Sequence, residues 1–433
     1  MRFKTAWRLL GSLLFVIFIG TFLLSLPISA KNEPIKVVDA FFTASSAVCV
    51  TGLVTKDLSK DFSLFGQIVI LFLIQIGGLG IMTFAASVGL FLGQSYSLKQ
   101  KVLLKEILEA QSLAELKKVL KFIILFTFII ESIGAGFLFL NWIPYFGISL
   151  KNLYYSVFHS ISAFCNAGFS LFPDSLVRFR DNLATNLIFS FLIILGGLGF
   201  FVNRDLFFFK TRFKLHTKIV LLMSLILLVS GSLIFYLLEF NNSLSKLPVK
   251  EKILASWFQS VTARTAGFNT LSIKNLKIPT QIFLMFLMFI GACPGSTGGG
   301  IKTTTLFVIF KSIIDFIKGR RNSFILGREI PLENFKRAVS VFCFGLFSIF
   351  IFTIFISIEE NFAFDKILFE VTSAFATCGL STGITPFLKD MSKILLSVLM
   401  IIGKLGPVTF AYLLRSEPKE EKFSFPQEGV MVG

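Results

Sequence analysis

Charged residues are scarce in this sequence. Only 15% of its 433 residues are charged, and 42 lysines and arginines outnumber 25 acidic residues. Histidine is nearly absent: His159 and His216 are widely separated, and we expect both to be structural. The sequence also offers no carboxylate pair, catalytic triad or zinc-ligand spacing. These shortages exclude a soluble enzyme.

Cysteine is sparse as well, and its number is odd. The five cysteines lie in or beside apolar segments, which is not the pattern of a disulfide-linked secreted domain. Cys49, Cys165 and Cys378 fall in three similar segments described below. We interpret them as small buried residues, with a thiolate metal cluster as the alternative.

Apolar residues, by contrast, are abundant. The chain is 54% hydrophobic, contains 56 phenylalanines and has a mean hydropathy of +0.80. This composition predicts an all-α polytopic membrane protein. Eight apolar stretches are long enough to span a bilayer, namely residues 9–29, 64–93, 119–142, 184–209, 218–240, 280–317, 337–358 and 392–414. The first follows three basic residues and is too long for a signal-peptide core, so we expect it to be retained as a helix.

The predicted membrane topology explains most of the net charge of +17. Lysines and arginines gather in the linkers after the second, fourth and sixth apolar stretches, which predicts that these linkers and both termini are cytoplasmic. One outer segment, residues 246–277, is basic too, whereas the other outer segments contain several acidic residues. We therefore expect a multi-pass protein of the cell membrane whose partner is lipid and not nucleic acid.

Four semi-polar segments between the apolar stretches each end in a lone glycine. These segments are residues 43–52, 159–168, 259–267 and 370–379. Each is too polar for lipid and too short to cross a bilayer, as expected of a re-entrant loop that lines a pore. A second set of glycines, near residues 77, 196, 291 and 403, follows in step with the first. The sequence thus predicts four helix–pore loop–helix repeats, with eight transmembrane helices and four re-entrant P-loops, around one pseudo-fourfold ion pore.

The repeats define the expected domains. Residues 1–95 form pore unit 1, residues 96–212 pore unit 2 with a leading cytoplasmic helix, and residues 213–320 pore unit 3 with an intramembrane gating loop at 291–305. Residues 321–415 form pore unit 4, and 416–433 a cytoplasmic tail. The basic stretch Lys101–Lys121 is interpreted either as an amphipathic helix on the membrane or a partner, or as a solvated connector.

Each short helix that enters a loop should point its C-terminal, negative dipole end toward the pore centre, which favours cations. Carbonyl oxygens beside each glycine can then replace the water shell of potassium. The alternative is that these glycines are ordinary helix caps. The expected ion-binding residues are Val50, Thr51 and Gly52; Asn166, Ala167 and Gly168; Thr265, Ala266 and Gly267; and Thr377, Cys378 and Gly379.

Glycine and proline break the sixth apolar stretch, which indicates a loop across the conduction path. The expected gating residues are Gly291, Pro294, Gly295, Ser296, Thr297, Gly298, Gly299, Gly300, Lys302 and, from the last span, Lys404. Lys404 is an intramembrane cation and is expected to reach carbonyls of this loop as an electrostatic barrier. A phosphate-binding loop is the competing interpretation, but Ile301 spoils its spacing. Arg264 is expected near the outer mouth, where it braces neighbouring helices against Glu370.

These motifs resemble a known family. Segments 46–53, 162–170, 262–270 and 376–383, with GlySerThrGlyGlyGlyIleLysThrThr at 295–304, closely resemble the Trk/Ktr/HKT superfamily of potassium transporters, and in particular its KtrB-type membrane subunits. The resemblance spans essentially the whole chain. It implies filter glycines at Gly52, Gly168, Gly267 and Gly379 and a gating loop at 291–305. Sodium-preferring HKT relatives carry serine at the first position, so Gly52 points to potassium.

The resemblance also implies partners. It implies a homodimer on a cytoplasmic ring of KtrA-type nucleotide-binding regulatory subunits. It also implies sodium-dependent potassium uptake, with no organic cofactor in this chain. Residues 415–433 are too short to form such a regulatory domain. The family usually has arginine where this sequence has Lys404, which keeps the charge but loses the planar fork. The runner-up function is an alternating-access cation symporter that binds substrate at the broken sixth helix. An intramembrane enzyme would need paired polar catalytic groups, which we do not find in the sequence.

Overall fold

The computed structural model describes residues 3–80, 83–84, 113–208, 213–320 and 323–406. Within these ranges four helices are long and apolar enough to cross a bilayer, or five if one bent pair counts as a single span. The four long helices are α1 (Phe3–Ser25), α6 (Leu113–Phe146), α10 (Leu215–Glu239) and α14 (Leu332–Glu359). Many of their phenylalanines and leucines are exposed, as expected of surfaces that face lipid.

Each long helix is followed by a short helix whose side chains are mostly buried. These are α2 (Val37–Val48), α7 (Leu150–Phe164), α11 (Val249–Thr262) and α15 (Phe364–Ala376). A loop and a further helix come next, so the same order of elements occurs four times. The further helices are α3 (Leu64–Leu79), α8 (Leu183–Leu198) continued by α9 (Phe200–Phe207), α12 (Ile278–Phe289) continued by α13 (Thr303–Ile317), and α16 (Asp390–Leu405).

Local chemistry sets several helix starts. Ser63, Ser149 and Asn182 precede α3, α7 and α8, and each side chain accepts a hydrogen bond from a backbone N–H of the first turn. Between the helices lie single 3₁₀ turns, which are η1 (Pro27–Ser29), η2 (Val177–Phe179), η3 (Ile273–Asn275) and η4 (Thr385–Phe387). The helices pack into a continuous apolar core that surrounds the short helices.

Two of the predicted spans are not straight. The fourth breaks at Gly199, where φ is +91° and α9 turns by 108° from α8. Glycine tolerates this φ at little cost, and the new direction lets the N–H of Phe200 donate to the carbonyl of Gly295 at 3.0 Å. The sixth span is interrupted between Phe289 and Thr303, as the sequence predicted.

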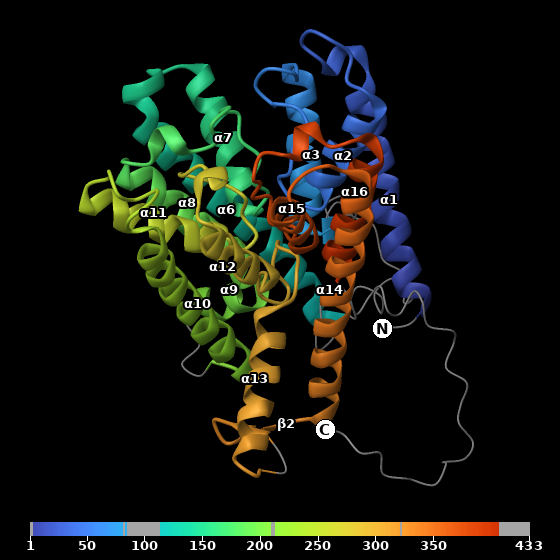
Figure 1. The fold of residues 1–433 in the computed structure, drawn as a ribbon, viewed down its shortest axis with the longest axis vertical. Coiled ribbons are helices and arrows are strands. Elements are labelled where there is room, and N and C mark those ends of the chain that lie inside the picture. Colours follow the sequence, from blue (N-terminus) through green and yellow to red (C-terminus); the bar gives the residue numbers. More distant parts are fainter. Residues whose placement is uncertain (1–2, 81–82, 85–112, 209–212, 321–322, 407–433) are drawn as a thin grey trace.

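The all-α prediction was wrong in one place. Strands β1 (Ser323–Ile325) and β2 (Arg328–Ile330) form a small antiparallel hairpin near the end of α13 that lies farther from the core in Figure 1. Both residues of its turn, Leu326 and Gly327, have positive φ, the type I′ conformation that suits two-residue hairpins. Sequence reasoning missed it because a leucine rarely adopts positive φ.

The basic stretch Lys101–Lys121 is only partly described. Residues 101–112 lie outside the described ranges, as do most of the predicted leading helix of unit 2 and the whole tail 416–433. The rest of the stretch, from Leu113, forms the first turns of α6. Its last three lysines, Lys117, Lys118 and Lys121, therefore belong to a long apolar helix and not to a separate surface helix.

The second set of glycines lets helices approach each other. A Cβ built at Gly77, Gly196 or Gly403 would collide with a carbonyl oxygen at the C-terminal end of the preceding short helix. The carbonyls belong to Val48, Phe164 and Phe375, respectively. Each following helix is thus in direct contact with the end of its short helix, which fixes where the intervening loop lies.

We predict that Gly403→Ala lowers the free energy of unfolding by about 1–3 kcal/mol, the usual cost of overpacking a tight contact. Gly136→Ala in α6 is the matched control, because a Cβ there meets no atom within 4 Å. The control should be neutral or slightly stabilising, since alanine favours helix. Thermal unfolding of the purified protein in detergent measures both variants; equal midpoints would contradict the packing role.

Candidate functional site

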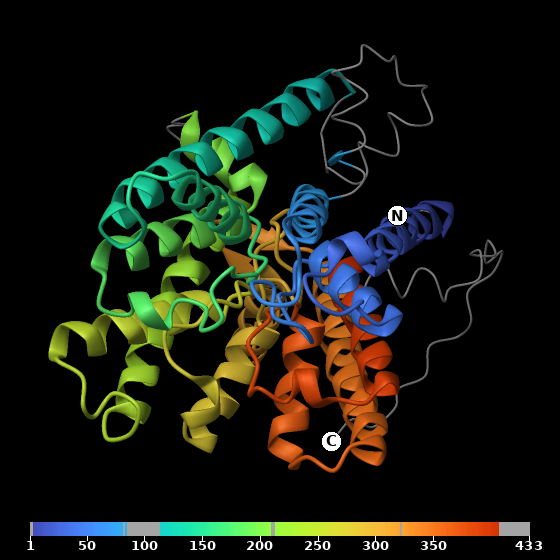
Figure 2. The same cartoon turned by 90° about the horizontal axis from the view of Figure 1, so that it is seen from above.

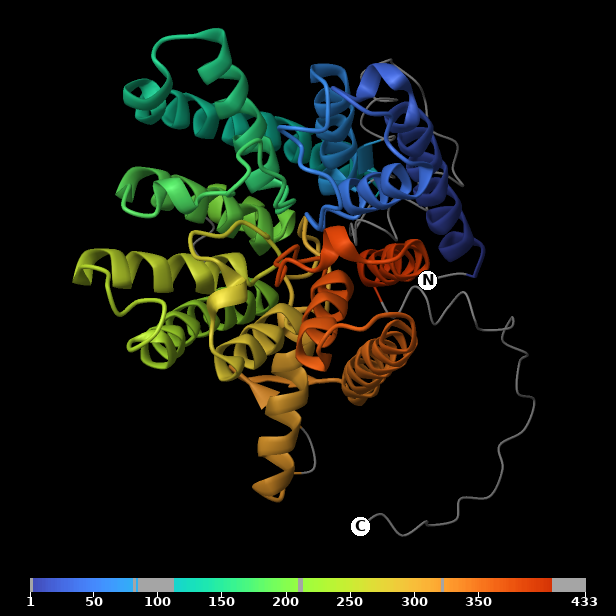
Figure 3. The ribbon, with the colours of Figure 1, turned by 45° about the horizontal axis from the view of Figure 1, so that its top comes forward.

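The loops after α2, α7, α11 and α15 meet at the middle of the molecule (Figures 2 and 3). They contain the four segment glycines, and all the residues predicted to bind an ion lie in them. We number them loop 1 (residues 49–53), loop 2 (165–169), loop 3 (263–268) and loop 4 (377–380). Segments more than 320 residues apart in sequence are therefore brought to one place.

The four glycines form a closed ring of neighbours. A Cβ built on each would meet a carbonyl oxygen of the next loop, at 2.5–2.8 Å in the three wider cases. The pairs are Gly52 with Ala167, Gly168 with Ala266, Gly267 with Cys378, and Gly379 with Thr51, which closes the ring. The predicted residues of all four segments thus lie around one centre, and a carbonyl oxygen from each loop lies at the junction with its neighbour.

One backbone feature of the ring was not predicted. The residue two positions before each glycine has positive φ, although none of the four is glycine. They are Val50 at 58°, Asn166 at 57°, Thr265 at 70° and Thr377 at 49°. Left-handed φ costs an L-residue about 1–2 kcal/mol, and β-branched residues such as valine and threonine are rare there. The same strained position in all four loops means that the surrounding structure holds each loop backbone in the same unusual conformation.

Hydrogen bonds turn the loop N–H groups back toward the short helices. The N–H of Thr51 donates to the carbonyl of Ser46 at 2.8 Å, and that of Ala167 to Ser162 at 2.8 Å. Loops 3 and 4 repeat the bond at 2.9 Å, from Ala266 to Thr262 and from Cys378 to Ser373. Because these N–H groups donate to carbonyls of the short helices, they do not occupy the carbonyl oxygens of the loops. The partial negative charge of the loop carbonyls is therefore available at the ring.

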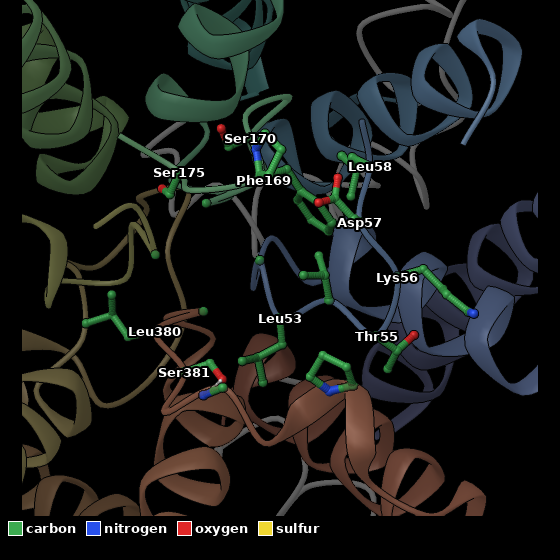
Figure 4. Close-up of a pocket in the computed structure, with 18 of the residues that line it drawn as sticks. Leu53, Thr55, Lys56, Asp57, Leu58, Phe169, Ser170, Ser175, Leu380 and Ser381 are labelled. Atoms are coloured by element: carbon green, nitrogen blue, oxygen red, sulfur yellow. Dashed lines mark hydrogen bonds between the residues drawn. The ribbon is translucent and has the colours of Figure 1, made fainter. Parts of the chain in front are cut away.

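A cavity of about 690 Å³ opens on one side of the ring (Figure 4). It is lined by the four glycines and by the residues that follow them in the chain, among them Leu53, Phe169, Asn269 and Ser381. The cavity joins the glycine ring to the outside of the molecule. A small solute can therefore reach the carbonyl ring from this side.

The loop between α12 and α13 lies against the opposite side of the ring. The N–H of Gly299 donates to the hydroxyl of Thr377 at 3.0 Å, and Gly298 packs so closely on Thr265 that a Cβ there would collide with its hydroxyl. Further bonds tie the N–H of Cys293 to the carbonyl of Gly197 at 3.0 Å. All the residues predicted for gating within Gly291–Thr305 thus lie in a segment that directly contacts the strained residues of loops 3 and 4.

Two lysines hold this loop by its carbonyls. Lys404 Nζ donates to Thr297 O at 2.6 Å, and Lys302 Nζ donates to Gly298 O at 2.7 Å. The contact of Lys404 with the loop is confirmed; its action as an electrostatic barrier stays a prediction. A single ammonium needs only one good carbonyl acceptor, so lysine fulfils this contact without the planar fork of arginine.

The predicted partner of Arg264 was wrong. Its guanidinium donates to Ser224 Oγ on α10 at 3.2 Å and to Cys293 Sγ at 3.5 Å, and not to Glu370. Glu370 instead accepts hydrogen bonds from Ser381, Thr382 and Thr385 beside the cavity. Arg264 therefore braces loop 3 against the interrupted sixth span, on the side away from the outer mouth. Linear spacing could not show which way this side chain turns.

A buried ion pair was also missed. Lys393 Nζ on α16 lies 2.8 Å from Asp39 Oδ1 on α2, and the two side chains are 9% and 3% exposed. The pair joins the first and last quarters of the chain beside the cavity. Its partners are 354 residues apart in sequence, so no local signal predicts it.

The fold and the site together define a class of protein. Long lipid-facing helices enclose a ring of backbone carbonyls that is open to a polar cavity on one side and covered by a glycine loop on the other. This is the architecture of an integral membrane protein whose four loops converge on one centre.

Comparison with known proteins identifies the family. Residues 12–424 match the family model TrkH, described as cation transport protein, and the chain belongs to this family. It is therefore a transport protein and not an enzyme. The chain is 40% identical to the Ktr system potassium uptake protein B of Bacillus subtilis (strain 168), over 100% of this chain and 98% of the relative. It is 36% identical to the potassium/sodium uptake protein NtpJ of Enterococcus hirae, over 98% and 96%.

A solved structure has the same fold. The crystal structure of the potassium transporter TrkH from Vibrio parahaemolyticus superposes with a TM-score of 0.73, covers 93% of this chain and 84% of its own, and is 22% identical in sequence. The mostly helical architecture described above is thus a TrkH-like fold.

We predict that Lys393→Met lowers the free energy of unfolding by about 3–5 kcal/mol, because it leaves the Asp39 carboxylate buried without its partner. Adding Asp39→Asn to this variant should recover a large part of the loss. The midpoint of thermal unfolding in detergent measures each variant. A double variant no more stable than Lys393→Met alone would show that the pair is not coupled.

Proposed function

We propose that this chain is the membrane subunit of a Ktr-type potassium uptake system in the cell membrane, and that potassium crosses through the centre of the four-loop ring. One observation carries the proposal: the glycine of each loop lies against a carbonyl oxygen of the next loop, so that the four loops surround one centre. The names of the similar proteins, which are potassium uptake proteins, agree with potassium as the transported ion.

The proposed filter works through backbone dipoles. Potassium must lose water to pass a narrow ring, and carbonyl oxygens at a suitable spacing replace that water. The positive φ at Val50, Asn166, Thr265 and Thr377 turns successive peptide groups, while glycine two residues later leaves room for the neighbouring loop. The ring therefore comprises the twelve residues predicted from the sequence, three from each loop.

We further propose four pore units in one chain, each a helix, a pore loop and a helix, with eight spans in total. The repeated element order and the shared strained position support this arrangement. In this proposal the bent pair α8–α9 and the interrupted pair α12–α13 each count as one span. The termini are cytoplasmic, in keeping with the positive-inside pattern of the linkers.

The segment Gly291–Thr305 is proposed as the gate. It covers the side of the ring opposite the cavity, and its glycines leave little side-chain bulk to move. Lys404 and Lys302 place two positive charges beside it, which opposes the passage of a cation while the loop is in place.

The finer assignments rest on the relatives. The term Ktr system in their names supports a partnership, for which we propose a homodimer on a KtrA-type nucleotide-binding ring. The potassium/sodium uptake name of the Enterococcus hirae relative supports sodium as a coupling or activating ion. No organic cofactor is needed for a filter built from the main chain.

We predict that Gly379→Ala lowers the selectivity for potassium over sodium about tenfold, the effect of ~1.4 kcal/mol of lost discrimination. The added Cβ would collide with the carbonyl of Thr51. Gly383→Ala is the matched control: φ is +94° there and +89° at Gly379, but a Cβ at residue 383 meets nothing within 4 Å. Both variants thus carry similar backbone strain, and only one disturbs the ring.

Potassium and sodium fluxes into liposomes containing the purified chain measure this selectivity. Unchanged selectivity in Gly379→Ala, in protein that remains folded, would argue against the filter and favour a carrier with its site at the interrupted helix.

We predict that Lys404→Met raises potassium flux about fivefold, as expected when a barrier falls by ~1 kcal/mol. The substitution removes both the charge and the hydrogen bond to Thr297. Lys318→Met at the end of α13 is the control, because that exposed lysine lies away from the ring. Deletion of residues 295–300 should raise flux in the same assay. Loss of transport with intact folding in both variants would contradict gating.

A further inference from the structure

The four short helices share a polar position that the proposed filter does not use. Each short helix has one serine or threonine whose side chain forms a hydrogen bond with the loop that follows it. The shared polar position lies three residues before this side chain, which is Ser46 in α2, Ser162 in α7, Thr262 in α11 and Ser373 in α15. The four residues at this position, which we call the anchor position, are Thr43, His159, Gln259 and Glu370. All four are buried, with at most 1% of their surface exposed. Their identities differ, and so do their contacts.

In loop 4 the anchor residue holds the chain that leaves the ring. Glu370 accepts hydrogen bonds from Ser381 Oγ at 2.7 Å, from the N–H of Thr382 at 2.8 Å and from Thr382 Oγ1 at 3.0 Å. Its second oxygen accepts from Thr385 Oγ1 at 2.8 Å. Ser381 and Thr382 come directly after the loop, so the carboxylate ties the exit of the loop to its short helix.

Loop 2 is held in the same way by a different residue. His159 Nδ1 lies 2.8 Å from the carbonyl of Tyr155, which can only accept, so this nitrogen carries the proton. Its Nε2 then accepts from Ser170 Oγ at 3.0 Å and from the N–H of Leu171 at 3.3 Å. Ser170 and Leu171 occupy the places in loop 2 that Ser381 and Thr382 occupy in loop 4.

Loops 1 and 3 lack this bond. In the part of the chain that the structure describes, Thr43 Oγ1 and both amide atoms of Gln259 are buried without a hydrogen-bond partner. The hydroxyls at the places corresponding to Thr382, those of Thr55 and Thr270, are buried and unpartnered as well. The anchored loops, 2 and 4, alternate with the unanchored loops around the ring, and Ser170 and Ser381 lie on opposite sides of the cavity (Figure 4).

We propose that Glu370 and His159 are positioning residues for ion selectivity, which hold the exits of two opposite loops of the ring rigid through an anchor bond that loops 1 and 3 lack. In the cavity-size account of selectivity, a carbonyl ring discriminates between ions because its oxygens resist moving inward around a smaller ion. Buried hydrogen bonds that are fully satisfied supply that resistance. This inference rests on the proposed function, since it assigns a role to residues that act through the filter.

The test compares anchor substitutions in anchored and unanchored loops. Glu370→Leu removes the bonds to loop 4 and should lower potassium-over-sodium selectivity about fivefold, the factor that corresponds to about one net hydrogen bond. Glu370→Gln should keep more than half of the selectivity, because its amide oxygen still accepts from Ser381 and Thr382. Gln259→Leu and Thr43→Val change unpartnered groups and should leave selectivity within about twofold. Fluxes in liposomes measure all four variants.

A second variant acts from the other end of the contact. Ser381→Ala combined with Thr382→Val removes two of the donors to Glu370 without changing the short helix, so it carries the test if Glu370→Leu does not fold. Selectivity should fall in this variant too. Wild-type selectivity in it, or equal losses in Glu370→Leu, Gln259→Leu and Thr43→Val, would overturn the proposal.

The outcomes also separate this inference from the proposed function. If Gly379→Ala loses selectivity but the Glu370 and Ser381–Thr382 variants do not, the filter stands and the anchoring role fails. If Glu370→Gln loses as much as Glu370→Leu, the negative charge and not the hydrogen-bonded geometry matters, which contradicts positioning.

Discussion

The ring depends on four peptide segments being held in a left-handed conformation. Each strained residue costs about 1–2 kcal/mol, so the set opposes folding by an amount comparable to the stability of a small domain. The surrounding contacts must offset this cost. Loop N–H groups bond to the short helices, glycines 77, 196 and 403 bring the following helices against them, and the Lys393–Asp39 pair joins the first and last units.

The third unit differs from the other three, and the difference is structural in origin. In units 1, 2 and 4, a glycine of the helix after the loop lies against a carbonyl at the end of the short helix. In unit 3, Gly291 lies instead against the carbonyl of Gly299 in its own loop. The interrupted helix therefore folds back under the ring instead of packing straight past it. This one departure from the fourfold repeat is enough to cover the side of the ring opposite the cavity.

Sequence alone predicted the loops and the interrupted helix well, because glycine and proline have strong local effects. The left-handed residues were not predicted. Valine and threonine carry no local signal for positive φ, and asparagine, which adopts it more often, stands at only one of the four positions. Only tertiary contacts impose that conformation on Val50 or Thr377. The Lys393–Asp39 pair and the turn of Arg264 toward Ser224 were also beyond reach, since both depend on how distant helices pack. The bend at Gly199 was hidden within an unbroken apolar stretch, where hydropathy carries no directional information.

Three ionisable side chains beside the ring are each held by bonding partners. Asp39 is paired with Lys393, Glu370 is surrounded by hydroxyl and N–H donors, and Lys404 is bonded to a loop carbonyl. An unpaired carboxylate in the ring would hold a cation tightly and slow its release, whereas carbonyl dipoles compensate for lost water without adding charge. In the proposed gate, Lys404 of α16 and Lys302 at the start of α13 place the opposing positive charge beside the loop. In this proposal the carbonyl oxygens of the ring attract and select the ion, whereas Lys404 and Lys302 oppose its passage. Because these are different residues, selectivity and gating can each change without altering the other.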